Sequence, residues 1–104
     1  MNIIIVGGGL VGTELAYSMS LRGSHRIAIV DNDADRARYL AEELDAFVLQ
    51  GDGTDPSMLR KAGLEDADAL AAVTEVDAVN VVVAMLAKQA GVGTVVARIE
   101  GVGL

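Results

Sequence analysis

The chain has 104 residues, of which 52% are apolar and 3% aromatic, with a formal net charge of −7 and no cysteine. One domain is expected at this length, and the scarcity of aromatic residues favours the aliphatic core of a buried parallel sheet. The acidic charge argues against a nucleic acid partner or an anionic membrane surface, and the lack of cysteine excludes disulfides and thiolate sites.

An apolar stretch followed by three glycines opens the chain. Residues 2–6 are predicted as a strand buried on both faces, because its apolar residues follow one another without alternation. Gly7, Gly9 and Gly12 then form a G-x-G-x-x-G pattern, and a helix is predicted over residues 11–21. In a nucleotide-binding unit the first glycine permits the tight turn, the second lets the backbone approach a pyrophosphate, and the third lets the helix pack on the strand. The pattern therefore predicts a Rossmann-like unit whose helix N-terminus faces phosphates.

The second strand, predicted over residues 26–31, ends in an acidic residue. Asp31 follows Gly12 by about 20 residues, the spacing at which a carboxylate takes the ribose hydroxyls of a dinucleotide. A carboxylate at this position repels a 2′-phosphate, which favours NAD over NADP. The alternative interpretation of Asp31 is a solvated strand end without a ligand.

Short strands and helices alternate along the rest of the chain. With short links, this alternation predicts an α/β fold, a doubly wound parallel sheet of strand order 3-2-1-4-5 that ends before or near a sixth strand. We expect one Rossmann-like domain over residues 1–104, with no pattern in residues 101–104. No basic leader and no apolar run of about 18 residues is seen, so neither a signal peptide nor direct membrane insertion is expected. The remaining strands are predicted over residues 46–50, 69–73 and 94–99.

Two of the connecting helices have clear start signals. Asp33 is expected to cap a helix over residues 34–44, in which apolar residues recur at helical spacing. Asp55 as N-cap and Pro56 at the first helical position predict a short helix that ends at Lys61.

The last helix, predicted over about residues 75–90, is apolar nearly all round. Thr74 and Asp77 have the spacing of a capping box at its start. A helix that packs only on a sheet needs one apolar stripe, so the second stripe predicts a subunit interface in a homodimer or higher ring. The alternative is that this helix is entirely internal.

Four stretches together resemble the TrkA-N family, the N-terminal nucleotide-binding domain of regulators of potassium conductance (RCK-N). The resemblance covers nearly the whole chain. The GDGTDP block at residues 51–56 is much more specific than a lone G-x-G-x-x-G. The stretches are residues 3–12, residues 51–56, residues 64–69 leading to 73–80, and residues 94–99.

The resemblance implies a ligand-sensing regulatory module and no enzymatic activity. Family members lie on the cytoplasmic side of potassium channels and transporters, bind NAD(H), ATP or ADP, assemble as dimers and rings, and gate the membrane partner. Leu10 stands where many members have an arginine that contacts a terminal phosphate. NAD or NADH is therefore the expected cofactor, with ADP or ATP as the alternatives. The last strand, final helix and C-terminal ligand-binding domain of the family have no counterpart in these residues.

The nucleotide is expected to lie across the carboxyl ends of strands one to four. Backbone amides from Gly9 to Gly12 would hold the pyrophosphate, and Asp31 the ribose. With the resemblance, Asp52 is expected near the adenine or its ribose, although an aspartate beside a glycine also braces turns. Thr74 is either a helix cap or a site residue. The predicted cofactor-binding residues are Gly7, Gly9, Leu10, Val11, Gly12, Asp31, Asn32, Asp52, Gly53, Thr54, Thr74 and Arg98, with no catalytic residue and no metal ligand.

Arg98 is the cation at the end of the fifth strand, and it is interpreted either as a phosphate ligand or as half of a surface salt bridge. Two other functions remain open beside the regulatory one. The chain could be the cofactor half of an NAD-dependent oxidoreductase, but a Tyr-x-x-x-Lys pair and a strand-end histidine are missing. It could also be a fragment that keeps the fold without the partner.

Overall fold

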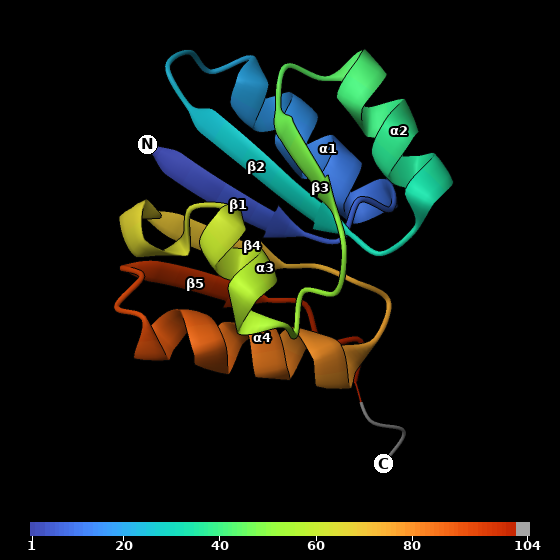
Figure 1. The fold of residues 1–104 in the computed structure, drawn as a ribbon. Coiled ribbons are helices and arrows are strands. Elements are labelled where there is room, and N and C mark those ends of the chain that lie inside the picture. Colours follow the sequence, from blue (N-terminus) through green and yellow to red (C-terminus); the bar gives the residue numbers. More distant parts are fainter. Residues whose placement is uncertain (102–104) are drawn as a thin grey trace.

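The structure, a computed structural model, describes residues 1–101. Its five strands form one parallel sheet in the order β3-β2-β1-β4-β5 (Figure 1). This arrangement confirms the predicted doubly wound, Rossmann-like sheet. The strands are β1 (Asn2–Val6), β2 (Arg26–Asp31), β3 (Phe47–Gln50), β4 (Ala69–Ala72) and β5 (Thr94–Ala97).

Helices cover both faces of the sheet. α1 and α2 lie on one side, and α3 and α4 lie on the other (Figure 1). β1 shows why its sequence has no polar alternation: Ile3 and Ile5 pack in the core under α1 and α2, while Ile4 and Val6 pack in the core under α3 and α4. The helices are α1 (Leu10–Ser20), α2 (Ala34–Glu43), α3 (Pro56–Lys61) and α4 (Asp77–Gln89).

The differences from the predicted elements are mainly at their ends. β4 and β5 stop earlier than expected, because the chain leaves the sheet after Ala72 and Ala97 to form the loops beside the cleft described below. A single 3-10 turn, η1 (Leu64–Asp66), was not predicted. Of the patternless end, residues 102–104 lie outside the described part of the chain.

The predicted capping box at α4 is wrong. The N-cap residue is Val76, and it makes no side-chain cap hydrogen bond. Thr74 instead hydrogen-bonds through its hydroxyl to Asn80 Oδ1 at 2.7 Å and accepts the N–H of Val76 at 3.2 Å. Asp77 Oδ1 accepts the backbone N–H of Glu100 at 3.1 Å. The side chains of Thr74 and Asp77 therefore bond to other partners, Thr74 to nearby residues and Asp77 to Glu100, which is 23 residues further along the chain.

The two predicted aspartate caps are confirmed. Asp33 Oδ1 accepts the N–H of Arg36 at 3.0 Å, and Asp55 Oδ1 accepts the N–H of Ser57 at 2.9 Å. The Ser57 hydroxyl also donates to Asp55 at 2.8 Å. These hydrogen bonds stabilise the ionised carboxylates. The hydroxyl and then the N–H of Ser57 hold the pKa of Asp55 below its ordinary value of 3.8, and the N–H of Arg36 is the main cause of the lowered pKa of Asp33.

The Asp55 cap should make part of the free energy of unfolding depend on pH in the acidic range. Because its pKa is lower in the folded chain, the folded state binds fewer protons, and its stabilising contribution is lost as pH falls below 3.8. Asparagine still caps a helix but does not titrate. Asp55→Asn should therefore lose less stability than the parent between about pH 5 and pH 3, as measured by urea unfolding. Equal losses in the two proteins would contradict the cap's role.

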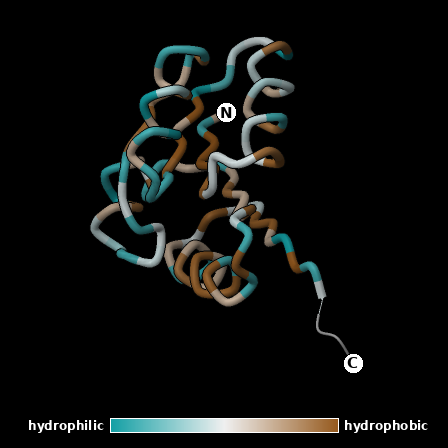
Figure 2. Tube along the Cα trace, turned by 90° about the vertical axis from the view of Figure 1, so that its right-hand side faces the viewer, coloured by the Kyte–Doolittle hydropathy of each residue, from teal (hydrophilic) through white to brown (hydrophobic). Residues whose placement is uncertain are grey.

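α4 has the second apolar face that its sequence predicts. Its buried side chains include Val83 and Ala87, which pack against the sheet. Val81, Val82 and Met85 are exposed at 45%, 42% and 58%. Figure 2 shows apolar residues around much of this helix. Within residues 1–101, the alternative of an entirely internal helix is therefore excluded. No helix among residues 1–101 has the length and apolarity needed to cross a bilayer.

Candidate functional site

A cleft of about 400 Å³ opens at the carboxyl ends of the strands. This is the edge at which open α/β sheets bind ligands, where strand order reverses between β1 and β4. Two predicted residues, Gly12 and Thr54, are not on the cleft wall. The other ten predicted residues all line it: Gly7, Gly9, Leu10, Val11, Asp31, Asn32, Asp52, Gly53, Thr74 and Arg98.

The turn between β1 and α1 forms the floor of the cleft. Gly7 has a φ of +108°, and a Cβ there would lie 2.8 Å from the backbone nitrogen of Thr74. At Gly9, by contrast, a Cβ would have only the Nη1 atom of Arg36 nearby, at 4.0 Å. Gly9 is the N-cap of α1 with no side-chain cap, and the first turn has no acidic residue. The first N–H groups of α1 and its positive dipole end are therefore free to take an anion.

Gly12 and Thr54 support the cleft from behind. A Cβ on Gly12 would lie 1.7 Å from the carbonyl oxygen of Gly7, so only glycine lets α1 approach β1 this closely. Thr54 donates its N–H and its hydroxyl to Asp52 Oδ1, at 2.9 and 2.7 Å. These two bonds hold the pKa of Asp52 below its ordinary value of 3.8. The turn-bracing role of Asp52 is thus present in the structure, and its proposed ligand contact would be additional.

Asp31 braces the glycine turn from the end of β2. Its Oδ2 accepts the N–H of Gly8 at 2.8 Å, and its Oδ1 accepts the N–H of Asp33 at 2.9 Å. The side chain is only 2% exposed, which excludes the alternative of a solvated strand end. Each carboxylate oxygen has two acceptor sites, so a ribose hydroxyl could still bind there.

Arg36 is a cleft residue that the sequence interpretation missed. It lies in the first turn of α2, lines the cleft, and places Nη1 3.5 Å from Asp31 Oδ2. The leucine at position 10 predicts a glycine turn without a cation, whereas Arg36 supplies one from the neighbouring helix. Because Asp33 caps α2, the third helical position turns back over the end of β2, and that spacing is the signal that could have identified Arg36.

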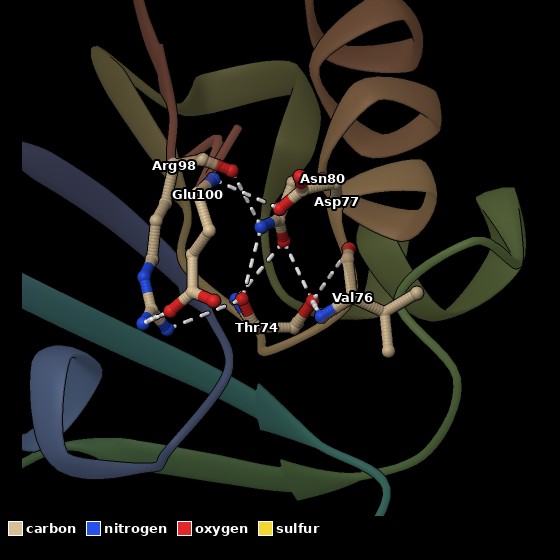
Figure 3. A network of polar contacts seen from close by, with 6 residues as sticks. All are labelled: Thr74, Val76, Asp77, Asn80, Arg98 and Glu100. Atoms are coloured by element: carbon tan, nitrogen blue, oxygen red, sulfur yellow. Dashed lines mark hydrogen bonds and ion pairs between the residues drawn. The ribbon is translucent and has the colours of Figure 1, made fainter. Parts of the chain in front are cut away.

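A polar network closes the other side of the cleft (Figure 3). Asn80 is fully buried on α4, and its Oδ1 accepts the N–H and the hydroxyl of Thr74, at 2.9 and 2.7 Å. Its Nδ2 donates to the carbonyl oxygens of Thr74, at 3.0 Å, and Arg98, at 2.8 Å. The Arg98 guanidinium pairs with Glu100 and reaches the Thr74 carbonyl at 3.5 Å. The salt-bridge interpretation of Arg98 is thus confirmed, and Asn80 positions both predicted residues.

Comparison with known proteins places the chain in a family. The model of the TrkA-N domain matches residues 3–102. The Trk system potassium uptake protein TrkA of Halomonas elongata is 47% identical over 87 residues, which are 84% of this chain and 19% of that protein. The chain therefore spans about a fifth of the length of this relative.

Two solved structures share the fold. The structure described as Shewanella denitrificans Kef CTD in AMP bound form has a TM-score of 0.76 at 21% identity, over 92% of this chain and 57% of that one. The GsuK channel bound to NAD has a TM-score of 0.73 at 20% identity, over 91% of this chain and 21% of that one. At these identities the likeness establishes the fold alone, whereas the match over residues 3–102 establishes the family. The chain belongs to the TrkA-N domain family.

Proposed function

We propose that this domain binds an adenine nucleotide at the carboxyl edge of its sheet and, as part of a longer protein, regulates potassium transport. The observation that carries the proposal is the uncapped start of α1 at Gly9, open to the cleft beside the buried carboxylate of Asp31. The Kef and GsuK structures, described as AMP bound and bound to NAD, support nucleotide binding by proteins that contain this fold. The TrkA relative supports the link to potassium uptake.

NAD or NADH is the favoured ligand, with ADP or ATP as the alternatives. The pyrophosphate would lie on the amides of residues 9–12, the ribose at Asp31, and the adenine beside the Asp52–Gly53 turn. Leu10 is 80% exposed at the mouth of the cleft and offers no charge to a third phosphate. Asn32, which follows β2, and Thr74, which follows β4, would flank the ligand on either side of β1.

The exposed apolar face of α4 is the proposed subunit interface of a homodimer or higher ring. A contiguous patch of valine and methionine is a liability on a lone domain, and pairing buries it. The assembled domains would act on a membrane potassium channel or transporter from its cytoplasmic side. The nucleotide can bias this partner only by binding the two packing states of the paired domains with different affinities.

The proposed role is regulatory and not catalytic. The ionisable side chains on the described cleft wall are Asp31, Arg36, Asp52, Glu75 and Arg98. Hydride transfer with a nicotinamide cofactor requires a proton donor or acceptor beside the reacting carbon, a role that histidine fills most often, and the described wall carries no histidine. Turnover of NADH with an added carbonyl substrate would contradict the regulatory role.

Asp31 provides the test of nucleotide binding. We expect at least one of NAD, NADH, ADP and ATP to raise the melting temperature of the parent chain. Asp31→Ala should weaken NAD binding about tenfold or more in titration calorimetry, because a charge-assisted hydrogen bond to the ribose is lost. Asp45→Ala removes an exposed aspartate outside the cleft and should leave the affinity unchanged.

Two results would count against this site. If none of the four nucleotides shifts the melting temperature, the proposed function is wrong. If Asp31→Ala stays folded by circular dichroism and binds NAD as tightly as the parent, the ribose assignment is wrong. Asp31→Asn keeps one acceptor oxygen, for the Asp33 N–H, but its NH2 group cannot accept the N–H of Gly8, so it removes the charge together with half of the turn brace.

A further inference from the structure

Arg36 places a positive charge in the part of the cleft between Gly9 and Asp31, which is called the ribose corner below. Its Nη1 lies 3.5 Å from Asp31 Oδ2, and a Cβ built on Gly9 would be 4.0 Å from the same nitrogen. The guanidinium therefore lies between the proposed pyrophosphate-binding turn and the proposed ribose-binding carboxylate. Arg36 also lines the cleft, and its guanidinium carries five N–H donors, more than the contact with Asp31 uses.

The exposed charge at this corner is the cation and not the anion. The Asp31 side chain is 2% exposed, and its two oxygens already accept the N–H groups of Gly8 and Asp33. The Arg36 side chain is 45% exposed. A ligand that enters from solvent therefore meets the guanidinium before the carboxylate. The ion pair also offsets the repulsion that the carboxylate alone would exert on a phosphate.

We propose that Arg36 binds a phosphate on the 2′ position of the adenosine ribose. This inference rests on the proposed nucleotide binding. The cleft would then accept 2′-phosphorylated adenine nucleotides, the class that contains NADP, as well as NAD. Arginine suits this role because its planar fork of donors matches phosphate oxygens and keeps its charge at every physiological pH. This differs from the preference for NAD that follows from Asp31 alone.

Arg98, the other arginine on the described cleft wall, does not serve this corner. It follows β5, whereas Asp31 ends β2, and β1 and β4 separate these strands in the sheet. Its guanidinium is engaged with Glu100 and the carbonyl of Thr74 (Figure 3). A 2′-phosphate beside Asp31 would therefore have Arg36 as its arginine partner.

Two matched ligand pairs isolate the 2′-phosphate. AMP and adenosine 2′,5′-bisphosphate differ only by that group, as do NAD and NADP. Titration calorimetry should show that Arg36→Ala weakens adenosine 2′,5′-bisphosphate and NADP about tenfold or more, and AMP and NAD by less than about threefold. Arg36→Lys should recover part of the loss, since it keeps the charge without the planar fork.

Arg38→Ala is the matched control. Arg38 lies on the same helix, is 69% exposed, and pairs with Asp35 at 3.4 Å away from the cleft wall. The Arg38→Ala variant should bind AMP, adenosine 2′,5′-bisphosphate, NAD and NADP with the affinities of the parent. Arg36→Ala should also keep the parent's melting temperature within a few degrees, because the two backbone hydrogen bonds of Asp31 remain.

The outcomes separate this proposal from the proposed function. If the parent binds NAD or AMP but neither 2′-phosphorylated ligand, the 2′-phosphate site is wrong and nucleotide binding stands. If Arg36→Ala weakens both members of each pair equally, Arg36 contacts a part of the ligand that they share, and the proposal is again overturned. If the parent binds none of these four ligands, the 2′-phosphate site is wrong, and the melting-temperature test with NAD, NADH, ADP and ATP decides the proposed function separately.

Discussion

Gly12→Ala should prevent folding or lower the melting temperature by roughly 15 °C or more, a loss of about 4 kcal/mol. A Cβ at this position would lie 1.7 Å from the carbonyl oxygen of Gly7 and 2.8 Å from its carbonyl carbon. A carbon–oxygen contact needs about 3.3 Å, so α1 would have to move from β1 by about 1.5 Å. The obstacle is backbone, and no side-chain rotation can relieve it.

That movement would damage the site as well as the fold. α1 begins only two residues before Gly12, and its first turn forms the floor of the cleft. Ile5 in β1 lies beneath the same contact, with its Cγ2 3.4 Å from the position that the methyl group of an alanine would take. Both the apolar packing under α1 and the amides proposed to bind the pyrophosphate would therefore be displaced together.

Gly9→Ala is the matched substitution within the same motif. A methyl group there meets only the Nη1 of Arg36 at 4.0 Å, and the backbone of Gly9, at φ −71° and ψ −160°, suits any residue. Gly9→Ala should keep the parent's melting temperature but weaken nucleotide binding about tenfold or more, because the methyl group would occupy the space proposed for the pyrophosphate. Thermal unfolding and calorimetry on both variants test the pair. A stable Gly12→Ala, or a Gly9→Ala that binds normally, would contradict these roles.

The local patterns of the sequence were sufficient for the fold. The apolar run before Gly7 predicted a doubly buried strand, and the alternation of strands and helices predicted the order β3-β2-β1-β4-β5. Asp33 and Asp55 marked their helices correctly, because a cap is a contact between neighbours in the chain. The same reasoning placed ten of the cleft residues, since parallel strands bring their carboxyl ends to one edge.

The sequence was insufficient where contacts join distant segments. Thr74 has the spacing of a cap residue, but its N–H and hydroxyl bond to Asn80 in α4, and Arg98 reaches its carbonyl from the segment after β5. Arg36 was missed for a related reason. Arg36 matters to the cleft because it pairs with the buried carboxylate of Asp31. The burial of Asp31 results from packing by several elements, which a local sequence pattern does not show. A capping pattern therefore gives way when a buried polar side chain can satisfy the same backbone groups.

Asn80→Ala should lower the free energy of unfolding by about 3 kcal/mol, because several buried polar groups lose their partner at once. Asn80 is fully buried and makes four hydrogen bonds, to the N–H, hydroxyl and carbonyl of Thr74 and to the carbonyl of Arg98 (Figure 3). The network joins the loop after β4 to the segment after β5. Its loss should loosen Thr74 on the cleft wall and thereby weaken nucleotide binding.

Val83→Ala is the control for a merely structural effect. Val83 is fully buried on the same helix and packs against the sheet. Its side chain has no hydrogen-bonding group and therefore takes no part in the network around Thr74. Both variants should be less stable in urea unfolding. Below their melting temperatures, only Asn80→Ala should bind NAD more weakly than the parent. Equal affinities for the two variants would show that Asn80 stabilises the fold without positioning the cleft.

Asn80→Asp tests the direction of the hydrogen bonds. The introduced carboxylate still accepts from the N–H and hydroxyl of Thr74, but it cannot donate to the carbonyls of Thr74 and Arg98. Burial raises the pKa of such a carboxyl group, and the protonated form can donate one of the two lost bonds. The folded state then binds more protons than the unfolded state, so stability should fall as pH rises from about 5 to 8. Asn80→Ala has no group to titrate at this position and should show no added pH dependence relative to the parent. If Asn80→Asp and Asn80→Ala have the same pH profile, donation by Asn80 to the two carbonyls contributes little to the fold.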